Sequence, residues 1–568
     1  MRTCLLSGDW KKAYKMSEFQ SLRAVTLRAV PEYSFNDLKF RKAVPNSVLV
    51  NSFSALRTVA LNSGTGNYVS ARSSLRQPLT TLLFIIVLLI GLGSPGVILA
   101  QDTSDDSGLE EALSGFEEEA SAEEEGVLSG FDDEKDENGT DEEIESTDEE
   151  ESWKQTLGGF SGSAGLSASY SYAKDAPADK TQADWSGLTK LRPYFSLTWD
   201  AKLGENWKTR ISGKAFYDLA YGMKDSETFS DEVLSELEKE AELREIYLEG
   251  SPFGNLDIKL GKQIVSWGVA NSLRVVDVLN PTDDREFGMT DLEDIRLPIA
   301  MTKLDYYIGD LKLEAVAVHE IKFNKSAPFG SDFNPSTQKI NEVIPESSAE
   351  NTEYGLALIG TFSGWDASLH WAQYFDDTAH FKITKVTFIP GLGAVPTLEQ
   401  RHSRLTMGGA TLSIPSGNFI WKAEAAKLQG MEFALVTDKT FSRTDVLVGS
   451  EYSGWSDTSL TLEFGVQHLN DFDVKLEESP DSQLEDRIAT TVSFMQDYIN
   501  QTMHLSLVGM IIGKGGQDGG LNRMSLEYDV MDAFSVTGGA MLYQPGENAY
   551  FQSLNENDRI FFEARYSF

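Results

Sequence analysis

From residue 160 to the carboxyl end, apolar and polar residues alternate with a period of two, which is the spacing of a β-strand with two different faces. Leu166, Ala168 and Tyr170 share one side of such a segment, and serines occupy the other. Segments with the same alternation are residues 207–221, 354–362, 365–371, 419–425, 460–466 and 524–528. Short stretches that favour turns separate them, at 308–310, 363–365, 415–418, 453–457 and 531–534. The pattern predicts an all-β chain of antiparallel strands joined by tight turns.

Two architectures fit such a pattern, a soluble sandwich or a closed membrane barrel. Here the polar side carries full charges of both signs in strand after strand, and tryptophans such as Trp365, Trp421 and Trp455 lie on or beside the strand ends. A barrel places its apolar side against lipid, aromatic rings at the edges of the apolar band, and polar residues inside. We therefore predict a transmembrane antiparallel up-and-down β-barrel over residues 153–568, with about 16 strands (14–18) from the length that each spanning strand needs.

The chain ends on IFFEARYSF, whose apolar parity runs to the last residue. Phe562, Tyr566 and Phe568 share one side with Ala564, while Glu563 and Arg565 lie on the other. Such an ending is typical of the last strand of an outer-membrane barrel, which the barrel-assembly machinery binds through its exposed edge. We interpret Phe562, Tyr566 and Phe568 as the assembly signal.

The amino-terminal third carries targeting features. Residues 82–90 form an unbroken apolar run, Arg72 and Arg76 precede it, glycines and Pro95 break it, and Ala100 offers a cleavage site. This order predicts a signal peptide over residues 71–100 and export to the outer membrane of a Gram-negative bacterium. A retained transmembrane helix is the alternative. Residues 1–70 are interpreted as an over-extended start outside the fold.

Acidity is concentrated just after that run. The formal charge is −39, and residues 102–151 alone hold 24 acidic residues and one lysine. Burial of so few apolar residues cannot compensate for the conformational entropy lost on folding. Residues 101–152 are therefore predicted to be a disordered acidic linker. A weak cation-binding or partner-binding tether is the alternative. The acidity makes nucleic acid a poor candidate for a partner, and we expect none. The single cysteine is Cys4, so removal of the amino-terminal region would leave no cysteine for disulfides or thiolate metal sites. We expect no metal and no cofactor.

The leading functional hypothesis is a porin-like channel for small solutes with a charge-lined lumen, in which charged side chains filter the solute. The alternative reading of each charge is that it only satisfies a neighbour. The candidate lumen-lining residues are Lys208, Arg210, Lys214, Asp218, Lys312, Glu314, Lys422, Glu424, Arg523, Glu527, Glu563 and Arg565.

Two other functions are considered. A phospholipase-like barrel enzyme is suggested only by His504 and Ser506 on one side of MHLSLVGMII. A scaffold barrel that joins another envelope component would use the acidic linker as its handle. The solute and the oligomeric state are left open. The acidic, helix-like stretch of residues 230–245 is interpreted as an exposed connection.

Residues 242–284 contain a motif that is a more specific signal than the alternation of apolar and polar residues. It contains G-K-Q-x-x-x-W-G followed by N-P-x-D, and it resembles the Gram-negative outer-membrane barrel family known as domain of unknown function 1302. The matching residues are Gly261, Gln263, Trp267, Gly268, Asn280, Pro281 and Asp283. The resemblance implies a porin-like barrel for which hydrophobic or aromatic compounds are the suspected solutes. Many members carry an acidic residue where Val269 stands, so no role is transferred to that position.

The segment after the W-G is too long for a turn. It is predicted either to fold inward as a constriction or to lie outside as an extracellular flap. Trp267 is interpreted either as an anchor at the membrane interface or as a residue of the pore loop.

Overall fold

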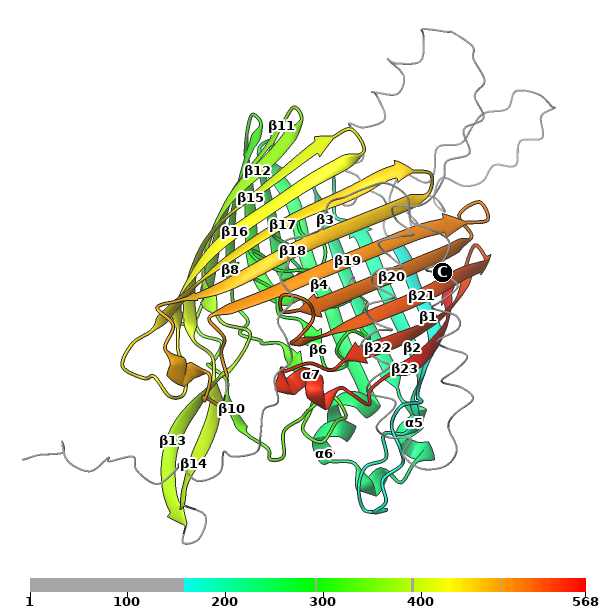
Figure 1. The fold of residues 1–568 in the computed structure, drawn as a ribbon. Coiled ribbons are helices and arrows are strands. Elements are labelled where there is room, and N and C mark those ends of the chain that lie inside the picture. The colour runs from blue at the N-terminus through cyan, green and yellow to red at the C-terminus, as the bar shows by residue number, and fades with distance from the viewer. Residues whose placement is uncertain (1–157, 292–293, 390–392, 481) are drawn as a thin grey trace, which may run out of the picture. The chain divides into compact units, whose positions relative to one another are not determined.

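A computed structural model describes residues 158–568, except 292–293, 390–392 and 481. The chain forms a closed sheet of 18 antiparallel strands (Figure 1). Each barrel strand pairs with the barrel strands before and after it, and β1 (Gly159–Ser171) pairs with β23 (Arg559–Ser567) to close the ring. The strand number lies at the upper limit of the predicted range, and the predicted fold class is confirmed.

The remaining barrel strands alternate in direction around the wall. They are β2 (Gly187–Lys202), β3 (Trp207–Tyr217), β4 (Lys239–Phe253), β5 (Leu256–Gln263), β7 (Ile299–Ile308), β8 (Leu311–Val318), β11 (Glu353–Phe362), β12 (Trp365–Phe375), β15 (Arg404–Ser416), β16 (Phe419–Met431), β17 (Phe441–Trp455), β18 (Thr458–Asn470), β19 (Asp486–Tyr498), β20 (Met503–Ile512), β21 (Gly519–Met531) and β22 (Phe534–Gln544).

Short turns lie at one end of the barrel and long connections at the other. The turns include those at Gly309, Gly364 and Gly417, each of which has a positive φ that suits glycine. The long connections carry the remaining elements: α5 (Leu219–Met223), η1 (Ser226–Thr228), α6 (Asp231–Val233), η2 (Leu234–Glu238), β6 (Asp283–Asp284), β9 (Lys325–Ser326), β10 (Asn341–Val343), β13 (His380–Ile389), β14 (Gly393–Arg401), η3 (Val474–Leu476) and α7 (Ala549–Ser553). Figure 1 shows the β13–β14 hairpin projecting from this end.

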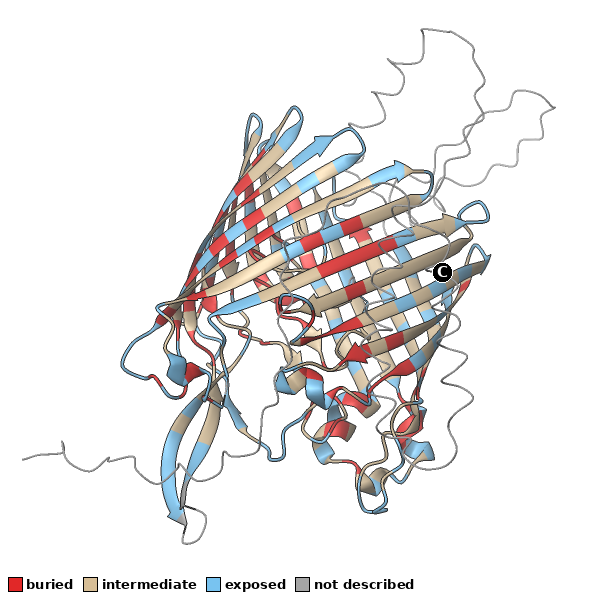
Figure 2. Cartoon of the chain, viewed as in Figure 1, coloured by how far each residue is buried: buried red, intermediate tan, exposed pale blue. Residues whose placement is uncertain are grey.

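The outer face of the wall is apolar. Exposed side chains recur every second residue, as at Leu356 and Leu358 of β11 or Leu462 and Phe464 of β18 (Figure 2). Aromatic pairs such as Phe362 with Trp365 stack beside the short turns, with ring centroids 4.4 Å apart. An apolar band with aromatic edges is what a lipid-facing barrel wall requires. No helix in the described parts of residues 158–568 is long and apolar enough to span a membrane.

The inner face is not uniformly polar, contrary to the expectation of a charge-lined interior. A core of buried apolar side chains fills the barrel between β5 and β18, and it includes Val276, Val318, Met407 and Leu447. Most of its members come from the wall and from the connection between β5 and β7, and Val436 and Leu476 come from two other long connections. Where these strands contribute to the core they are apolar on both faces, because the inner face packs against protein rather than against a water-filled lumen.

Several sequence expectations have definite outcomes here. The helix-like stretch at residues 230–245 is helical only to Glu238, and strand β4 takes over from Lys239, so that interpretation is half wrong. Charged residues alternate with apolar ones there, and pairing with β3 and β5 selects the strand. The expected start, signal peptide and acidic linker at 1–70, 71–100 and 101–152 lie outside the described residues.

Candidate functional site

The connection between β5 and β7, residues 264–298, is called the inward segment here. Its contacts are with residues in the middle of wall strands rather than with their ends. Trp267 bonds to Glu314 of β8, Val269 to Glu424 of β16, and Asn271 to Glu463 of β18. Asp291 reaches Arg523 of β21, on another part of the wall. The segment therefore runs inside the barrel across its width, which favours the constriction over the extracellular flap.

Two residues of the family motif hold the base of the inward segment. Asn280, fully buried, accepts a hydrogen bond from the Val265 amide (2.8 Å) and donates to the carbonyl oxygens of Gln263 and Leu297. The side-chain amide of Gln263 donates through Nε2 to the backbone carbonyl oxygen of Met301 at 3.1 Å. These bonds tie the start of the segment to its end, and they give side-chain partners to backbone groups that lie outside the regular strand pairing.

Trp267 is packed into the barrel interior and is not an interface anchor. Its side chain is 4% exposed, and its indole nitrogen donates to Glu314 Oε1 at 2.7 Å. A Cβ on Gly355 of β11 would lie 2.7 Å from the indole ring, so glycine leaves the room the ring occupies. Gly268 has φ +96°, and a Cβ there would lie 2.7 Å from Glu424. The W-G pair thus needs both an aromatic ring and a residue without a side chain.

Two wall carboxylates bind the backbone that follows. Glu424 accepts hydrogen bonds from the amides of Val269 (2.6 Å), Ala270 (2.8 Å) and Val276 (3.3 Å). Glu463 accepts from three successive amides at distances of 2.5, 3.0 and 3.1 Å, those of residues 271–273. Both glutamates are buried. An ionised acceptor that satisfies several amides forms strong bonds in such a site.

Replacing Trp267 with phenylalanine is expected to lower the free energy of unfolding by about 1–3 kcal/mol, because Glu314 would lose a buried donor. The ring would still fill its space beside Gly355. Chemical unfolding of the refolded barrel, followed by the fluorescence of the other tryptophans, measures the change. Trp421→Phe, which alters an exposed ring on the outer face, is the matched control.

A cavity of about 510 Å³ remains between the inward segment and the wall formed by β1 to β4 and β23. The wall supplies cations and also some acids, among them Glu240, Glu242 and Glu245, whereas the segment supplies mainly acids and one cation, Arg285. Glu286 lies 2.7 Å from Lys190 and 3.0 Å from Arg192, and Asp294 lies 2.5 Å from Lys214. Arg244, Arg565 and Glu563 also line the cavity. Ion pairs between the wall and the segment therefore join the two sides of the cavity, and the charges of both signs that line it set its electric field.

Two acids of the inward segment, Glu286 and Asp294, stay ionised. Burial alone would raise the pKa of Glu286, but the cations Arg192 and Lys190 outweigh it and hold that pKa well below its usual range. Burial opposes ionisation of Asp294 too, and Lys214 and Arg244 keep its pKa below the ordinary value. These two carboxylates therefore bind the wall cations throughout the physiological pH range.

The candidate residues divide into two groups. Lys214, Glu563 and Arg565 line the cavity, and Arg523 pairs with Asp291 of the inward segment. Pairs within the wall are Lys208 with Glu249, Arg210 with Asp200, Lys312 with Glu314, Lys422 with Glu451 and Glu527 with Arg565. Lys422 also donates to Asn271. Glu314 and Glu424 are buried as anchors, so they are not open to a solute.

Asp218 departs from its expected place. Its side chain is completely buried, accepts from the amide of Ala220 at the start of α5, and bonds to Arg192 at 3.2 Å. The strand ends at Tyr217, so the alternation that predicted a lumen position does not extend to Asp218. Asp283 pairs with Arg285 at 2.6 Å, and Pro281 accepts from the amide of Leu297 at 2.8 Å.

Sequence reasoning missed several residues of this site, among them Lys190, Arg192, Arg244, Glu286, Asp291, Asp294 and Glu463. Glu463 could have been predicted from the sequence, because it lies on the polar side of its strand between Leu462 and Phe464. The acids of the inward segment could not be predicted in this way, since apolar and polar residues do not alternate regularly in that segment.

The residues of the enzyme alternative do not act together. Both ring nitrogens of His504 are held by carboxylates, Asp497 at 2.7 Å and Asp529 at 3.2 Å. Neither is available to accept the proton of Ser506. Within the described part of the chain, no group of three or more His, Cys, Asp or Glu side chains is arranged to hold a metal ion.

A closed 18-stranded barrel with an apolar outer face and a lumen narrowed by its own chain defines a porin-like outer-membrane barrel. The sequence of residues 178–568 matches the family described as "Protein of unknown function (DUF1302)". The chain belongs to that family, as the motif in residues 242–284 predicts. A search of curated proteins found no match.

Solved structures with similarity include OccAB3 of Acinetobacter baumannii, at 9% identity and a TM-score of 0.41, over 72% of this chain and 98% of that one. The outer membrane protein opdK of Pseudomonas aeruginosa has 10% identity and a TM-score of 0.42, with coverages of 72% and 98%. A BenF-like porin of Pseudomonas fluorescens Pf-5 has 9% identity and a TM-score of 0.41, with coverages of 72% and 97%. At these scores the similarity adds no argument about the solute.

Proposed function

We propose that the protein is a porin-like channel of the outer membrane of a Gram-negative bacterium, which passes small solutes between the inward segment and the wall of β1 to β4. The observation that carries the proposal is the cavity of about 510 Å³, lined by charged side chains of both signs from the wall and from the inward segment. A segment that narrows the lumen without filling it is what size and charge selection require.

The partners of this function are lipid on the apolar outer face, the solute in the lumen, and the barrel-assembly machinery at the last strand. Support for the last comes from β23, which closes the ring: Gly162 and Phe568 exchange two backbone hydrogen bonds of 2.8 and 3.0 Å. Phe562 and Tyr566 point to the exposed side of that strand. An edge that must pair last is a suitable recognition element.

Planar-bilayer recording of the refolded protein tests the channel. We expect discrete conductance steps, and we expect Lys214→Gln to shift the reversal potential in a salt gradient toward cation selectivity, because it removes a partly exposed positive charge from the cavity. Lys439→Gln, an exposed change outside the cavity, should leave the reversal potential unchanged. A protein that inserts yet gives no steps would contradict the channel and favour the scaffold barrel.

A further inference from the structure

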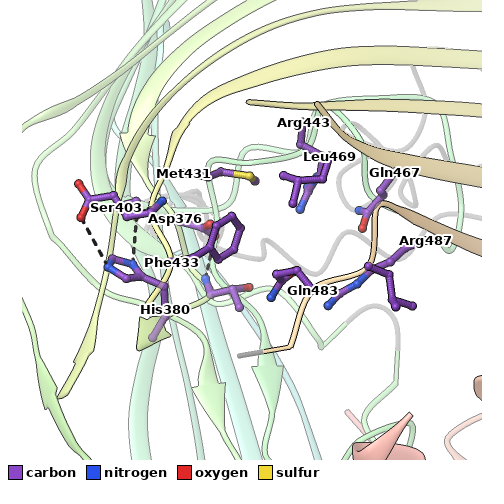
Figure 3. Close-up of a pocket in the computed structure, with 14 residues that line it drawn as sticks. Asp376, His380, Ser403, Met431, Phe433, Arg443, Gln467, Leu469, Gln483 and Arg487 are labelled. Atoms are coloured by element: carbon purple, nitrogen blue, oxygen red, sulfur yellow. Dashed lines mark hydrogen bonds and ion pairs between the residues drawn. The ribbon is translucent and has the colours of Figure 1, made fainter. Parts of the chain in front are cut away.

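A second cavity lies at the end of the barrel that carries the long connections. Its volume is about 300 Å³, and it shares no lining residue with the lumen cavity. The ends of strands β15 to β19 and the connections next to them enclose it (Figure 3). A solute that approaches the barrel from this end meets this cavity outside the narrow part of the lumen.

One side of the cavity presents a cation for which the described residues supply no ion-pair partner. Arg487, at the start of β19, is exposed, and its guanidinium meets the carbonyl oxygen of Ser482 at 3.4 Å. Among the described residues, no carboxylate lies within ion-pair distance of it. The neighbouring Arg443 is different, because Asp445 binds it through two hydrogen bonds of 2.7 Å. Arg487 is therefore the guanidinium of this cavity that lacks a carboxylate partner among the described residues.

The middle of the cavity is apolar. Met431 and Phe433 lie between the two polar sides in Figure 3, with Leu469 beside them. Leu484 also lines the cavity and is 42% exposed. An uncovered leucine next to an uncovered guanidinium fits a ligand that has both an apolar body and an anionic group.

The opposite side sets the direction of such a ligand. His380 lies 3.1 Å from Ser403 Oγ and 3.7 Å from Glu432, and Asp376 lies nearby. The acids on this side repel a carboxylate, whereas Arg487 with Gln467 and Gln483 attracts one on the far side (Figure 3). The charge of the cavity is thus divided along its length.

We propose that this cavity is a binding site for organic carboxylates with an apolar or aromatic body, held with the carboxylate on Arg487 and the body against Phe433, Met431, Leu469 and Leu484. The proposal rests on the proposed channel in one respect, that the bound compound is a solute on its way to the lumen. A planar guanidinium matches a carboxylate with two parallel hydrogen bonds, which lysine cannot do.

Isothermal titration calorimetry of the refolded protein in detergent tests the site, with 3-phenylpropionate as the probe. We expect 3-phenylpropionate to bind saturably. We expect 3-phenylpropan-1-ol, which lacks the carboxylate, and acetate, which lacks the apolar body, each to bind at least tenfold more weakly. Arg487→Gln should weaken binding of 3-phenylpropionate at least tenfold. Leu484→Asn should weaken the binding of 3-phenylpropionate and leave the binding of acetate unchanged. Lys514→Gln makes the same charge change at an exposed position outside the cavity and should have no effect.

Equal binding by wild type and Arg487→Gln would overturn the proposal, and so would equal binding of the acid and the alcohol. Refolding of each variant is checked by the heat-modified migration of the barrel, so a loss of binding by a folded variant counts. Bilayer recording separates this proposal from the channel. Conductance without Arg487-dependent binding contradicts only the site, and binding without conductance contradicts only the channel.

Discussion

Replacing Glu424 and Glu463 together with glutamine is expected to raise the single-channel conductance several-fold and to add current noise. The two carboxylates accept six backbone hydrogen bonds from residues 269–276. Hydrogen bonds to a charged group contribute about 1.5–3 kcal/mol each, and a neutral amide both weakens them and turns a donor toward the amides. The inward segment would then detach from the wall for part of the time, and the lumen would widen.

Each single variant should give a smaller increase, and the two effects should not add, because the anchors hold one segment. Glu547→Gln, at an exposed position of a long connection, is the control and should leave the conductance unchanged. A double variant with wild-type conductance and noise would show that the apolar core, not the carboxylates, keeps the segment in place.

The period of two was sufficient to predict the barrel, because each strand contacts lipid on one face, and the lipid acts on every strand alike. Phe562 and Glu563 fall on the sides that their parity predicts: Phe562 is 47% exposed, and Glu563 accepts a hydrogen bond from Tyr194 at 2.7 Å. The strand count was less certain, since turn signals do not show whether a short hairpin, such as β13 with β14, belongs to the wall.

The inner core could not be read from alternation, because the inward segment is irregular and its partners are distant in sequence. One local signal was present in Ala315-Val316-Ala317-Val318, where four successive apolar residues break the alternation of β8. A strand that is apolar on both faces must contact protein on the side away from lipid. Val316 and Val318 indeed pack into the core. The motif residues Trp267 and Gly268 indicated where the segment begins, but they did not predict which wall carboxylates bind it.

Replacing Glu286 with glutamine is expected to destabilise the barrel by about 3–5 kcal/mol, as removal of one member of a buried ion pair does. Glu286 lies between Lys190 and Arg192, whose side chains are 9% and 14% exposed, and the change leaves both cations without this partner. Arg192 keeps its bond to Asp218, so Lys190 is the group most affected. Equilibrium unfolding in lipid vesicles, followed by tryptophan fluorescence, gives the free energy at pH 7.

The difference between wild type and Glu286→Gln should depend on pH in a defined direction. Because the wild-type pKa is held below its usual range, the stabilisation is complete above the ordinary carboxyl pKa of about 4.3 and is lost as the pH falls toward the depressed value. The two proteins should therefore converge in acid and differ most near neutrality. Asp291→Asn removes an exposed partner of Arg523 in the same segment and should cost at most about 1 kcal/mol. A difference that stays constant from neutral pH into strong acid would contradict ionisation of Glu286 as its cause.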